Sequence, residues 1–169
     1  MSELRARPII SRSEITNPKL AQLFDYWSSK RAARFAPARS DIDPIDIPRL
    51  LPWVWLVDVI DGGNDFRGRL GGEKLVHFLG RQVTGKTLGA HSSNPFFAKV
   101  AKAFSVVVAN KQPLLRPAGP TNYAHKDIVE TEVLLLPLSD NGTDVTQIFG
   151  GFATMTPLTR ALDLEAAQG

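Results

Sequence analysis

Residues 53–72 decide the fold, and they read WVWLVDVIDGGNDFRGRLGG. Residues 53–60 are rich in valine, isoleucine and tryptophan, which fit the pleated surface of a sheet, so they predict a strand. Residues 61–64 have the Asp and Gly content of a tight turn, and residues 65–70 predict the returning strand. Because a hairpin joins antiparallel strands, this stretch favours an antiparallel sheet and argues against a parallel one.

The C-terminal part of the chain predicts three further strands. Residues 126–138 and 145–155 are strong strand candidates, and the turn between them, 139–143, contains Asn-Gly. Residues 113–123 form a weaker candidate that contains two prolines, so we expect an edge strand or a bulge there. With the first hairpin, these segments supply five antiparallel strands.

Two Asn-Pro pairs mark helix starts, because Asn caps a helix and Pro fits its first turn. One precedes a predicted helix over about residues 18–34, and the other precedes a helix over 95–110. A shorter helix is predicted at 73–79. The first helix is amphipathic, and its apolar stripe must be buried on its own sheet or against a second copy of the chain. The stripe consists of Leu20, Leu23, Phe24 and Trp27.

The order of these elements is a helix, two strands, a short helix, a longer helix and three strands. We therefore expect an α+β fold, with a five-stranded antiparallel sheet, helices on one of its faces and the N-terminal amphipathic helix in addition. The expected organisation is an N-terminal helix and Pro-rich connector over 1–52, a sheet domain over 53–156 and a C-terminal tail over 157–169.

Composition excludes several classes of function. The 169 residues are 43% hydrophobic and 22% charged, as in an ordinary globular domain. The sequence has no cysteine, which excludes disulfides, thiolate metal sites and a cysteine adduct to a flavin. No apolar run approaches the ~18 residues that span a bilayer, and the N-terminus lacks the apolar core of a signal peptide. We therefore expect a cytoplasmic protein with no membrane partner.

The charge pattern argues against a nucleic-acid partner. Lys and Arg outnumber Asp and Glu by only 20 to 17, and the basic residues are scattered along the chain. No three of them are adjacent, which is typical of a solvated surface.

Four pieces of sequence together resemble the PAS fold and, in particular, a family of small, stand-alone bacterial PAS-like proteins. The order and spacing of the pieces carry the resemblance, which covers about residues 20–156. It implies a sensory or ligand-binding module, usually dimeric, and a sheet with strand order 2-1-5-4-3. The pieces are Tyr26-Trp27 leading to 39–44 (RSDIDP), Leu51-Pro52 running into 56–59 (LVDV), 66–72 (FRGRLGG) and 80–85 (GRQVTG).

The resemblance also suggests a ligand pocket. Phe78, Phe97 and Phe104 fall on elements that would line the cavity of a PAS fold, and Arg69 or Arg81 could anchor an anionic ligand. The alternative is a filled core with surface arginines. The ligand and any cofactor stay unknown at this stage. Haem is not expected, because the predicted helix 95–110 has no histidine to serve as an axial ligand, and no metal site is predicted.

Residues 80–87, GRQVTGKT, match the phosphate-binding motif G-x-x-x-x-G-K-[ST]. A true phosphate loop lies between a strand and a long helix, whereas residues 88–95 contain a glycine and an Asn-Pro pair that would break such a helix. The expected role is a loop that closes a small cavity. No residue is assigned a catalytic role, since the sequence has no G-x-S-x-G motif.

The sequence thus predicts a non-catalytic PAS-type module for sensing, ligand binding or protein interaction. With no output domain recognised, its signal would pass to a partner in trans. We also expect a homodimer, with Phe24 and Trp27 at or beside the interface. The alternatives that stay open are a small-molecule enzyme of the hot-dog thioesterase type and a nucleotide binder that uses residues 80–87.

Overall fold

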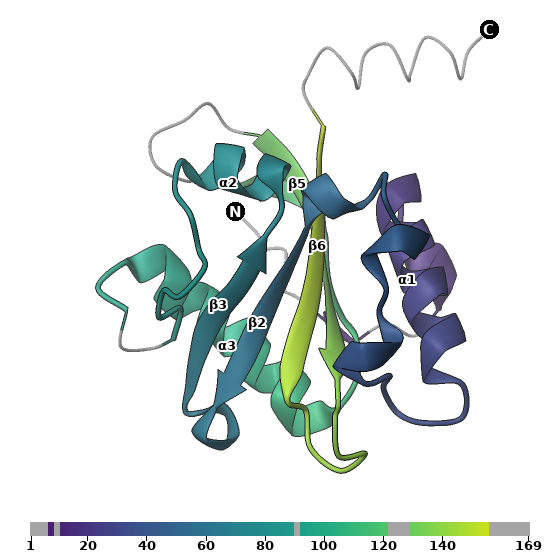
Figure 1. The fold of residues 1–169 in the computed structure, drawn as a ribbon. Coiled ribbons are helices and arrows are strands. Elements are labelled where there is room, and N and C mark those ends of the chain that lie inside the picture. Colours follow the sequence, from purple (N-terminus) through teal and green to yellow (C-terminus); the bar gives the residue numbers. More distant parts are fainter. Residues whose placement is uncertain (1–6, 9–10, 90–91, 122–128, 156–169) are drawn as a thin grey trace, which may run out of the picture.

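The computed structural model describes residues 7–8, 11–89, 92–121 and 129–155, so the predicted tail over 157–169 lies outside the described residues. Figure 1 shows the helices and strands of this part of the chain. The helices are α1 (Pro18–Arg31), α2 (Glu73–Leu79) and α3 (Pro95–Asn110). The strands are β1 (Arg7–Pro8), β2 (Val54–Ile60), β3 (Asp65–Gly71), β4 (Leu114–Thr121), β5 (Val129–Leu138) and β6 (Gln147–Met155).

All strand pairs are antiparallel, and the order across the sheet is β1-β4-β5-β6-β2-β3. The five predicted strands are β2 to β6, so the predicted order 2-1-5-4-3 is confirmed. Its central pair joins β2 to β6, with Trp55 opposite Gly150. The sixth strand, β1, was not predicted, because a two-residue strand is too short to show any alternation of apolar and polar residues.

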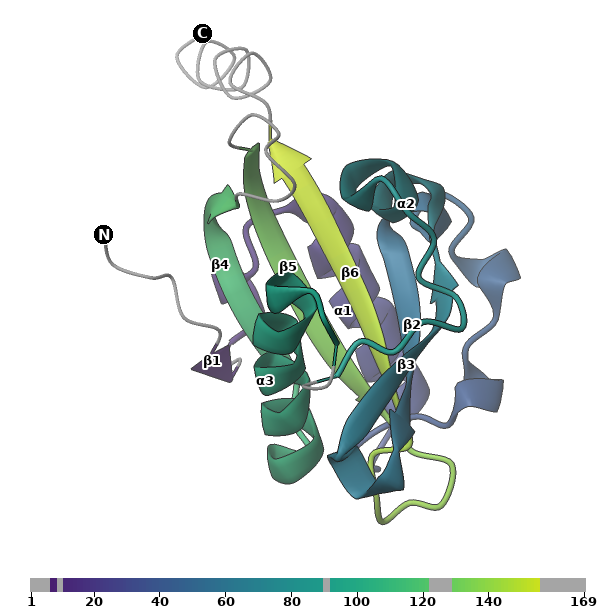
Figure 2. The same cartoon turned by 90° about the vertical axis from the view of Figure 1, so that its left-hand side faces the viewer.

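The helices lie on both faces of the sheet. Figure 2 shows α3 in front of the sheet and α1 behind it. α2 belongs to the α3 side, where Leu75 and Leu79 join the same hydrophobic cluster as Phe104. The side chains of β2 alternate accordingly, because Val54 and Leu56 join the cluster on the α1 side whereas Trp55 and Val57 join the other. On the sheet face that the α2–α3 layer leaves open, the N-terminal helix therefore covers β5 and β6.

The apolar stripe of α1 packs on its own sheet. Leu20 and Leu23 are each 1% exposed and Trp27 is 2% exposed, and the indole Nε1 of Trp27 donates a hydrogen bond of 2.8 Å to the carbonyl of Pro137. A side chain that is already buried within one chain has no surface left for a second copy. The predicted dimer interface of Leu20, Leu23, Phe24 and Trp27 stays a prediction, in which Phe24 is the member of the stripe that keeps a half-buried ring.

A buried carboxylate holds the beginning of α1. Glu132, on β5, is 3% exposed and accepts hydrogen bonds from the backbone N–H of Thr16 at 3.1 Å and of Asn17 at 2.8 Å. It also accepts one from the hydroxyl of Thr16 at 2.8 Å. A negative charge is stabilising at a helix N-terminus, where N–H groups lack partners within the helix. Glu132 thus fixes α1 to the middle of the sheet.

Two consecutive glycines on β6 let both layers approach the sheet closely. A Cβ added at Gly150 would lie 2.0 Å from the indole of Trp55, and one added at Gly151 would lie 2.5 Å from Leu23. These contacts lie on opposite faces, because successive residues of a strand point to opposite sides. Any side chain here would push either Trp55 or α1 away from the sheet.

Aromatic rings fill much of the space between the sheet and the α2–α3 layer. The rings of Phe66 and Phe104 meet edge to face with centroids 5.2 Å apart. Phe152 lies within 6.2 Å of three further rings by centroid distance, namely those of Trp53, Trp55 and Phe78. Such pairs add to the stability gained from burial alone. The interior on this side is therefore largely a packed aromatic core.

Candidate functional site

The segment between α2 and α3 lies along the free edge of β3. The backbone N–H of Gly85 donates to the carbonyl of Gly68 at 2.7 Å, and the N–H of Gly68 donates to the carbonyl of Lys86 at 2.9 Å. A third bond joins the N–H of Leu88 to the carbonyl of Phe66 at 2.8 Å. We call residues 83–88 the edge loop. It covers backbone groups that an edge strand would otherwise leave unpaired.

Gly68 makes this close approach possible. A Cβ added at Gly68 would lie 1.9 Å from the backbone oxygen of Val83, a distance that no real side chain tolerates. The turn within the edge loop also needs a glycine, because Gly85 has a φ of 76°, in the left-handed region. The Gly-rich composition of 80–89 thus reflects backbone packing against β3.

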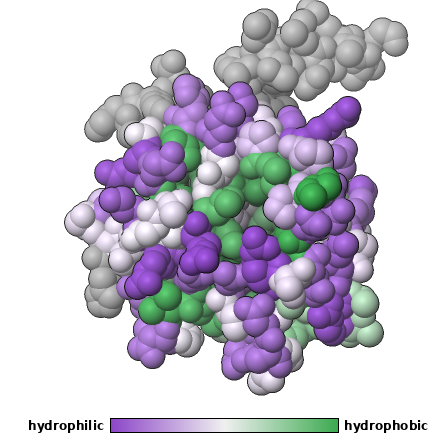
Figure 3. All heavy atoms as spheres, viewed as in Figure 1, coloured by the Kyte–Doolittle hydropathy of each residue, from purple (hydrophilic) through white to green (hydrophobic). Residues whose placement is uncertain are grey.

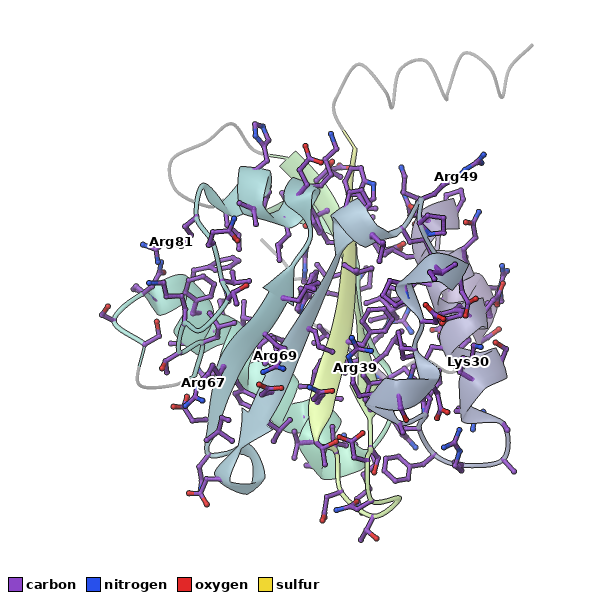
Figure 4. All side chains as sticks on the ribbon, in the orientation of Figure 1. Lys30, Arg39, Arg49, Arg67, Arg69 and Arg81 are labelled. Atoms are coloured by element: carbon purple, nitrogen blue, oxygen red, sulfur yellow. The ribbon has the colours of Figure 1, made fainter. Side chains whose placement is uncertain are left out.

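A hollow of about 500 Å³ opens between the edge loop and the start of α3. Its floor is apolar, because Val83, Leu88 and Phe97 are buried. Figure 4 shows Arg81, one of its rim residues, on the side of the molecule opposite α1. The described residues that line the hollow are Arg81, Gln82, Val83, Lys86, Thr87, Leu88, Ser92, Ser93 and Phe97.

The rim of the hollow is polar and positively charged. Arg81 and Lys86 are exposed there, and the three hydroxyl groups of Thr87, Ser92 and Ser93 stand beside them. No carboxylate belongs to the described lining. Ser92 and Ser93 directly precede Asn94, the N-cap of α3, so the positive end of that helix borders the hollow. The arrangement suits a small anion with an apolar part.

The structure brings together two of the five residues that the sequence suggested for a pocket. Arg81 and Phe97 both line the hollow. Phe104 is 2% exposed and packs against Phe66, while Phe78 packs against Phe152, so both belong to the aromatic core. Arg69 is exposed on β3, away from this lining.

Sequence reasoning did not name five polar residues of the lining. Gln82, Lys86 and Thr87 belong to the motif at 80–87, which is predicted only to close a small cavity, and no role is predicted for Ser92 and Ser93. The available signal was their composition, since hydroxyl and basic residues flank the Asn94-Pro95 helix start on its N-terminal side. Their convergence depends on how the edge loop folds back on β3, which residue spacing does not reveal.

The geometry of residues 80–87 differs from that of a phosphate-binding loop. The helix α2 precedes them in place of a strand, and no helix begins at Lys86. The N–H groups of Gly85, Lys86 and Leu88 already donate to carbonyls of the protein, with Lys86 bonded to Val83 at 3.0 Å. They are therefore not available to cradle phosphates, and the nucleotide alternative through this motif is not supported.

The described residues offer little to other classes of site. No group of three or more His, Asp or Glu among them is arranged to hold a metal ion. Of the helices in this part of the chain, none has the length and apolar character to cross a membrane.

Comparison with solved structures identifies the fold. The PAS domain of Bordetella pertussis BvgS matches with a TM-score of 0.50 and 19% identity, over 73% of this chain and 93% of that chain. An RNA-binding light-oxygen-voltage receptor matches with a TM-score of 0.50 and 15% identity, over 97% of this chain and 42% of that chain. No curated protein sequence matches.

The match to a family model extends beyond the sheet. The model describes the PAS domain and matches residues 15–153, which include α1, the connector after it and the five strands of the predicted order. This result also excludes the hot-dog alternative, in keeping with two strands before α3 and three after it. Because the match takes in most of the chain, from the residues before α1 to the last strand, the protein belongs to the PAS domain family.

Proposed function

We propose that this PAS domain is a non-catalytic sensory module that binds a small anionic ligand in the hollow and passes the signal to a partner protein in trans. The observation that carries the proposal is the composition of the hollow. Arg81 and Lys86 stand on its rim, and buried Val83, Leu88 and Phe97 form its floor. Ligand sites commonly combine an apolar surface with a few polar anchors.

The size of the hollow limits the ligand. About 500 Å³ lies within the range of small-molecule sites, which is roughly 300–1,000 Å³. Arg81 can bind a carboxylate or phosphate through two parallel N–H donors, and Lys86 adds a second positive charge. The hydroxyls of Ser92 and Ser93 can donate further hydrogen bonds.

The edge loop gives ligand binding a mechanical consequence. The hollow lies between the edge loop and α3, so a ligand there contacts two separate elements at once. The loop is tied to β3 by backbone hydrogen bonds at Phe66 and Gly68. A ligand that binds one position of the loop more tightly shifts the population toward that position. A ligand bound in the hollow thereby changes the position of the edge loop on β3.

The lining favours binding over catalysis. Its described members are two cations, three hydroxyls, one amide and three apolar residues. General acid–base catalysis by a side chain most often uses His, Asp or Glu, and the described lining includes none of them. The chain also lacks cysteine, so it has no thiol to form an adduct with a flavin. Binding and release of a ligand is the activity that these groups support.

Thermal unfolding in the presence of small carboxylates and phosphate monoesters tests the proposal. Native mass spectrometry of the purified protein first shows whether it retains a small molecule. A ligand at a hundredfold excess over its Kd stabilises the folded state by about 2.7 kcal/mol, which raises Tm by several degrees. We expect the increase to disappear in the double variant Arg81→Ala/Lys86→Ala.

The matched control is Arg49→Ala/Lys102→Ala. It removes one arginine and one lysine that are exposed elsewhere, on the connector and on α3. We expect this control to keep the full response. Equal responses from both double variants, or no response to any anion in the panel, would contradict the assignment of the hollow as an anion site.

The homodimer stays a prediction. With Leu20, Leu23 and Trp27 buried, Phe24 is the member of the stripe that can still reach a second copy. Sedimentation of the wild type and of Phe24→Asp at tens of micromolar distinguishes the two states. A dimer that Phe24→Asp dissociates would support this position, and a wild-type monomer would contradict it.

A further inference from the structure

Among the residues that the structure describes, no helix lies over the β2–β3 part of the sheet face on the α1 side. α1 contacts β5 and β6, and the connector residues Ile47 and Leu50 join the cluster that buries Leu56 on β2. Beyond that point, Figure 1 shows β2 and β3 in front of α3, with no helix over the side that faces the viewer. We call this region the open sheet face. It consists of Asp58, Ile60, Arg67, Arg69 and Leu70.

A β-bulge shapes the open sheet face. Leu56 lies opposite Leu70, and Val57 lies opposite Gly68, so Arg69 is an extra residue in β3 without a partner on β2. A bulge changes which side chains share a face of the strand. As a result, Leu70 shares the face of Leu56 and is 46% exposed, directly beside exposed Arg69.

The open sheet face carries an excess of positive charge. Arg67 and Arg69 are exposed and form no ion pair with any residue that the structure describes. Asp58 lies opposite Arg67 in the register, but its carboxylate accepts a hydrogen bond from Gln147 at 2.7 Å.

Apolar surface lies beside these charges. Figure 3, drawn from the same side as Figure 1, shows hydrophobic atoms at the centre of the face with hydrophilic atoms around them. Leu70 lies opposite Leu56 at one end of the open sheet face, whereas half-buried Ile60 lies at the other end, with Asp58 and Arg67 between them. Exposed apolar and charged side chains are thus neighbours on this face, and arginine is enriched in protein interfaces.

We propose that the open sheet face docks a partner protein through an acidic surface with an aliphatic side chain beside the acidic groups. The acidic groups would pair with Arg67 and Arg69, and the aliphatic side chain would cover Leu70. Complementary charge of this kind speeds association and selects the partner. The proposal extends the proposed function, because it says where the partner in trans would bind.

Charge and composition favour this occupant over two others. A second copy bound symmetrically would bring the arginines of one face against those of its twin, and like charges in an interface are costly. Single-stranded nucleic acid is usually bound by aromatic side chains interleaved with cations, and none of the five residues of the open sheet face is aromatic.

β3 joins the open sheet face to the hollow. Gly68 exchanges backbone hydrogen bonds with the edge loop, and its two neighbours in sequence are Arg67 and Arg69. The strand that holds the loop on its edge therefore presents the docking arginines on its face. A change in the position of the edge loop therefore acts on Gly68, one residue away from the arginines that would contact the partner.

Chemical-shift titration of the full chain tests the docking surface. The probe is a synthetic twelve-residue peptide of Asp, Glu and Leu, and the comparison probes are a Lys/Leu peptide and a single-stranded oligonucleotide. We expect the acidic peptide to shift amide resonances of β2 and β3. We expect Arg67→Glu/Arg69→Glu to weaken its binding about tenfold or more, and Leu70→Ala to weaken it about threefold.

Two controls make the result decisive. Arg49→Glu/Lys102→Glu changes net charge equally and should leave peptide binding within about twofold, because its charges lie outside the open sheet face. Arg67→Glu/Arg69→Glu should also keep the thermal response to the ligand of the hollow, which separates this proposal from the proposed function. Equal loss in both charge variants, shifts away from β2 and β3, or a stronger response to the oligonucleotide would overturn the docking surface.

Discussion

The two faces of the sheet are closed in different ways. On the α1 side, contacts between residues far apart in sequence hold one helix in place, through Glu132 at its start and the Trp27–Pro137 hydrogen bond near its end. On the α3 side, an aromatic core ends at the edge loop, which backbone hydrogen bonds attach to β3. The α1 side is thus fixed by long-range contacts, whereas the α3 side carries a segment that can open locally.

This difference has consequences for how each part unfolds. The anchors of α1 join residues that are more than a hundred positions apart and are buried, so α1 cannot leave the sheet without losing these bonds and exposing its apolar stripe. The edge loop joins segments about twenty residues apart and is largely exposed outside Val83 and Leu88. Regions with few buried contacts open at a lower free energy than the core. A sensor needs such a region beside a stable frame.

The strongest test of the comparison is Trp27→Ala on the α1 side. It removes a buried ring and the hydrogen bond to Pro137, and we expect the free energy of unfolding to fall by about 3–5 kcal/mol. Urea denaturation measures it. Trp27→Phe keeps most of the volume and should cost about 1–2 kcal/mol. A loss below about 1 kcal/mol for Trp27→Ala would show that the α1 face does not stabilise the domain.

Glu132→Ala tests the second anchor of α1. It leaves the N–H groups of Thr16 and Asn17 without their acceptor in a buried place, so we expect a loss of about 2–3 kcal/mol in the free energy of unfolding. Glu132→Gln retains one acceptor oxygen and should lose less. If the two variants unfold at the same urea concentration as the wild type, the carboxylate is not an anchor.

Gly68→Ala tests the α3 side. The added Cβ would collide with the backbone of Val83, so we expect the edge loop to leave β3, at a cost of about 1–2 kcal/mol in stability. Hydrogen exchange should accelerate at the amides of Gly85 and Leu88 while α1 stays protected. The response to hollow ligands should be lost as well.

The matched control for this variant is Gly71→Ala on the same strand. Its Cβ would meet only side-chain atoms, the nearest being Cγ2 of Val83 at 2.8 Å, and those can move. We expect exchange at Gly85 and Leu88 to stay near the wild-type rate. Accelerated exchange across α1 in Gly68→Ala would show that the two faces are not independent.

The smallest effect concerns Asp41 in the connector. A hydrogen bond from the backbone N–H of Ala38 and then one from Arg34 lower the pKa of Asp41 below its ordinary value of 3.8. A carboxyl whose pKa is lowered in the folded state stabilises that state above its ordinary pKa, and this contribution is lost as pH falls through the lowered pKa. We expect the difference in stability between wild type and Asp41→Asn to shrink as pH falls below the ordinary value of 3.8. A difference that stays constant as pH falls would contradict the pairing.

The fold was largely predictable because its signals are local. The helix 95–110 was predicted with its observed bounds, since Asn94-Pro95 fixes its start and apolar spacing fixes its length. β2 begins at Val54 rather than at residue 53, because Trp53 ends a short 3-10 turn over Leu51–Trp53. The α1 helix ends at Arg31 rather than near residue 34, because Ala32 adopts a positive φ of 52°. Alanine does not signal such a φ, so the sequence does not predict this end of the helix.

The candidate site was only partly predictable because it depends on contacts between segments. Arg81 and Phe97 were named from their expected positions in a PAS fold, but Lys86 reaches the rim only because the edge loop folds back on Gly68. The spacing of residues 80–87 suggested a phosphate loop, whose required backbone donors are used within the protein. The sequence likewise leaves open whether the stripe on α1 packs on its own sheet or against a second copy. The structure shows that its own sheet buries it.

The glycine pair of β6 also determines how closely the packing on one face of the sheet is coupled to the packing on the other. At Gly150 and Gly151 the wall between the two cores is a bare peptide chain, with Trp55 against one side and Leu23 against the other. At other positions of β5 and β6, a side chain such as that of Leu134 or Phe152 stands between the backbone and the layer that packs on it. At Gly150 and Gly151 no side chain lies in between, so Trp55 and Leu23 pack directly on neighbouring peptide units of one strand, and a displacement of either side chain meets the backbone itself.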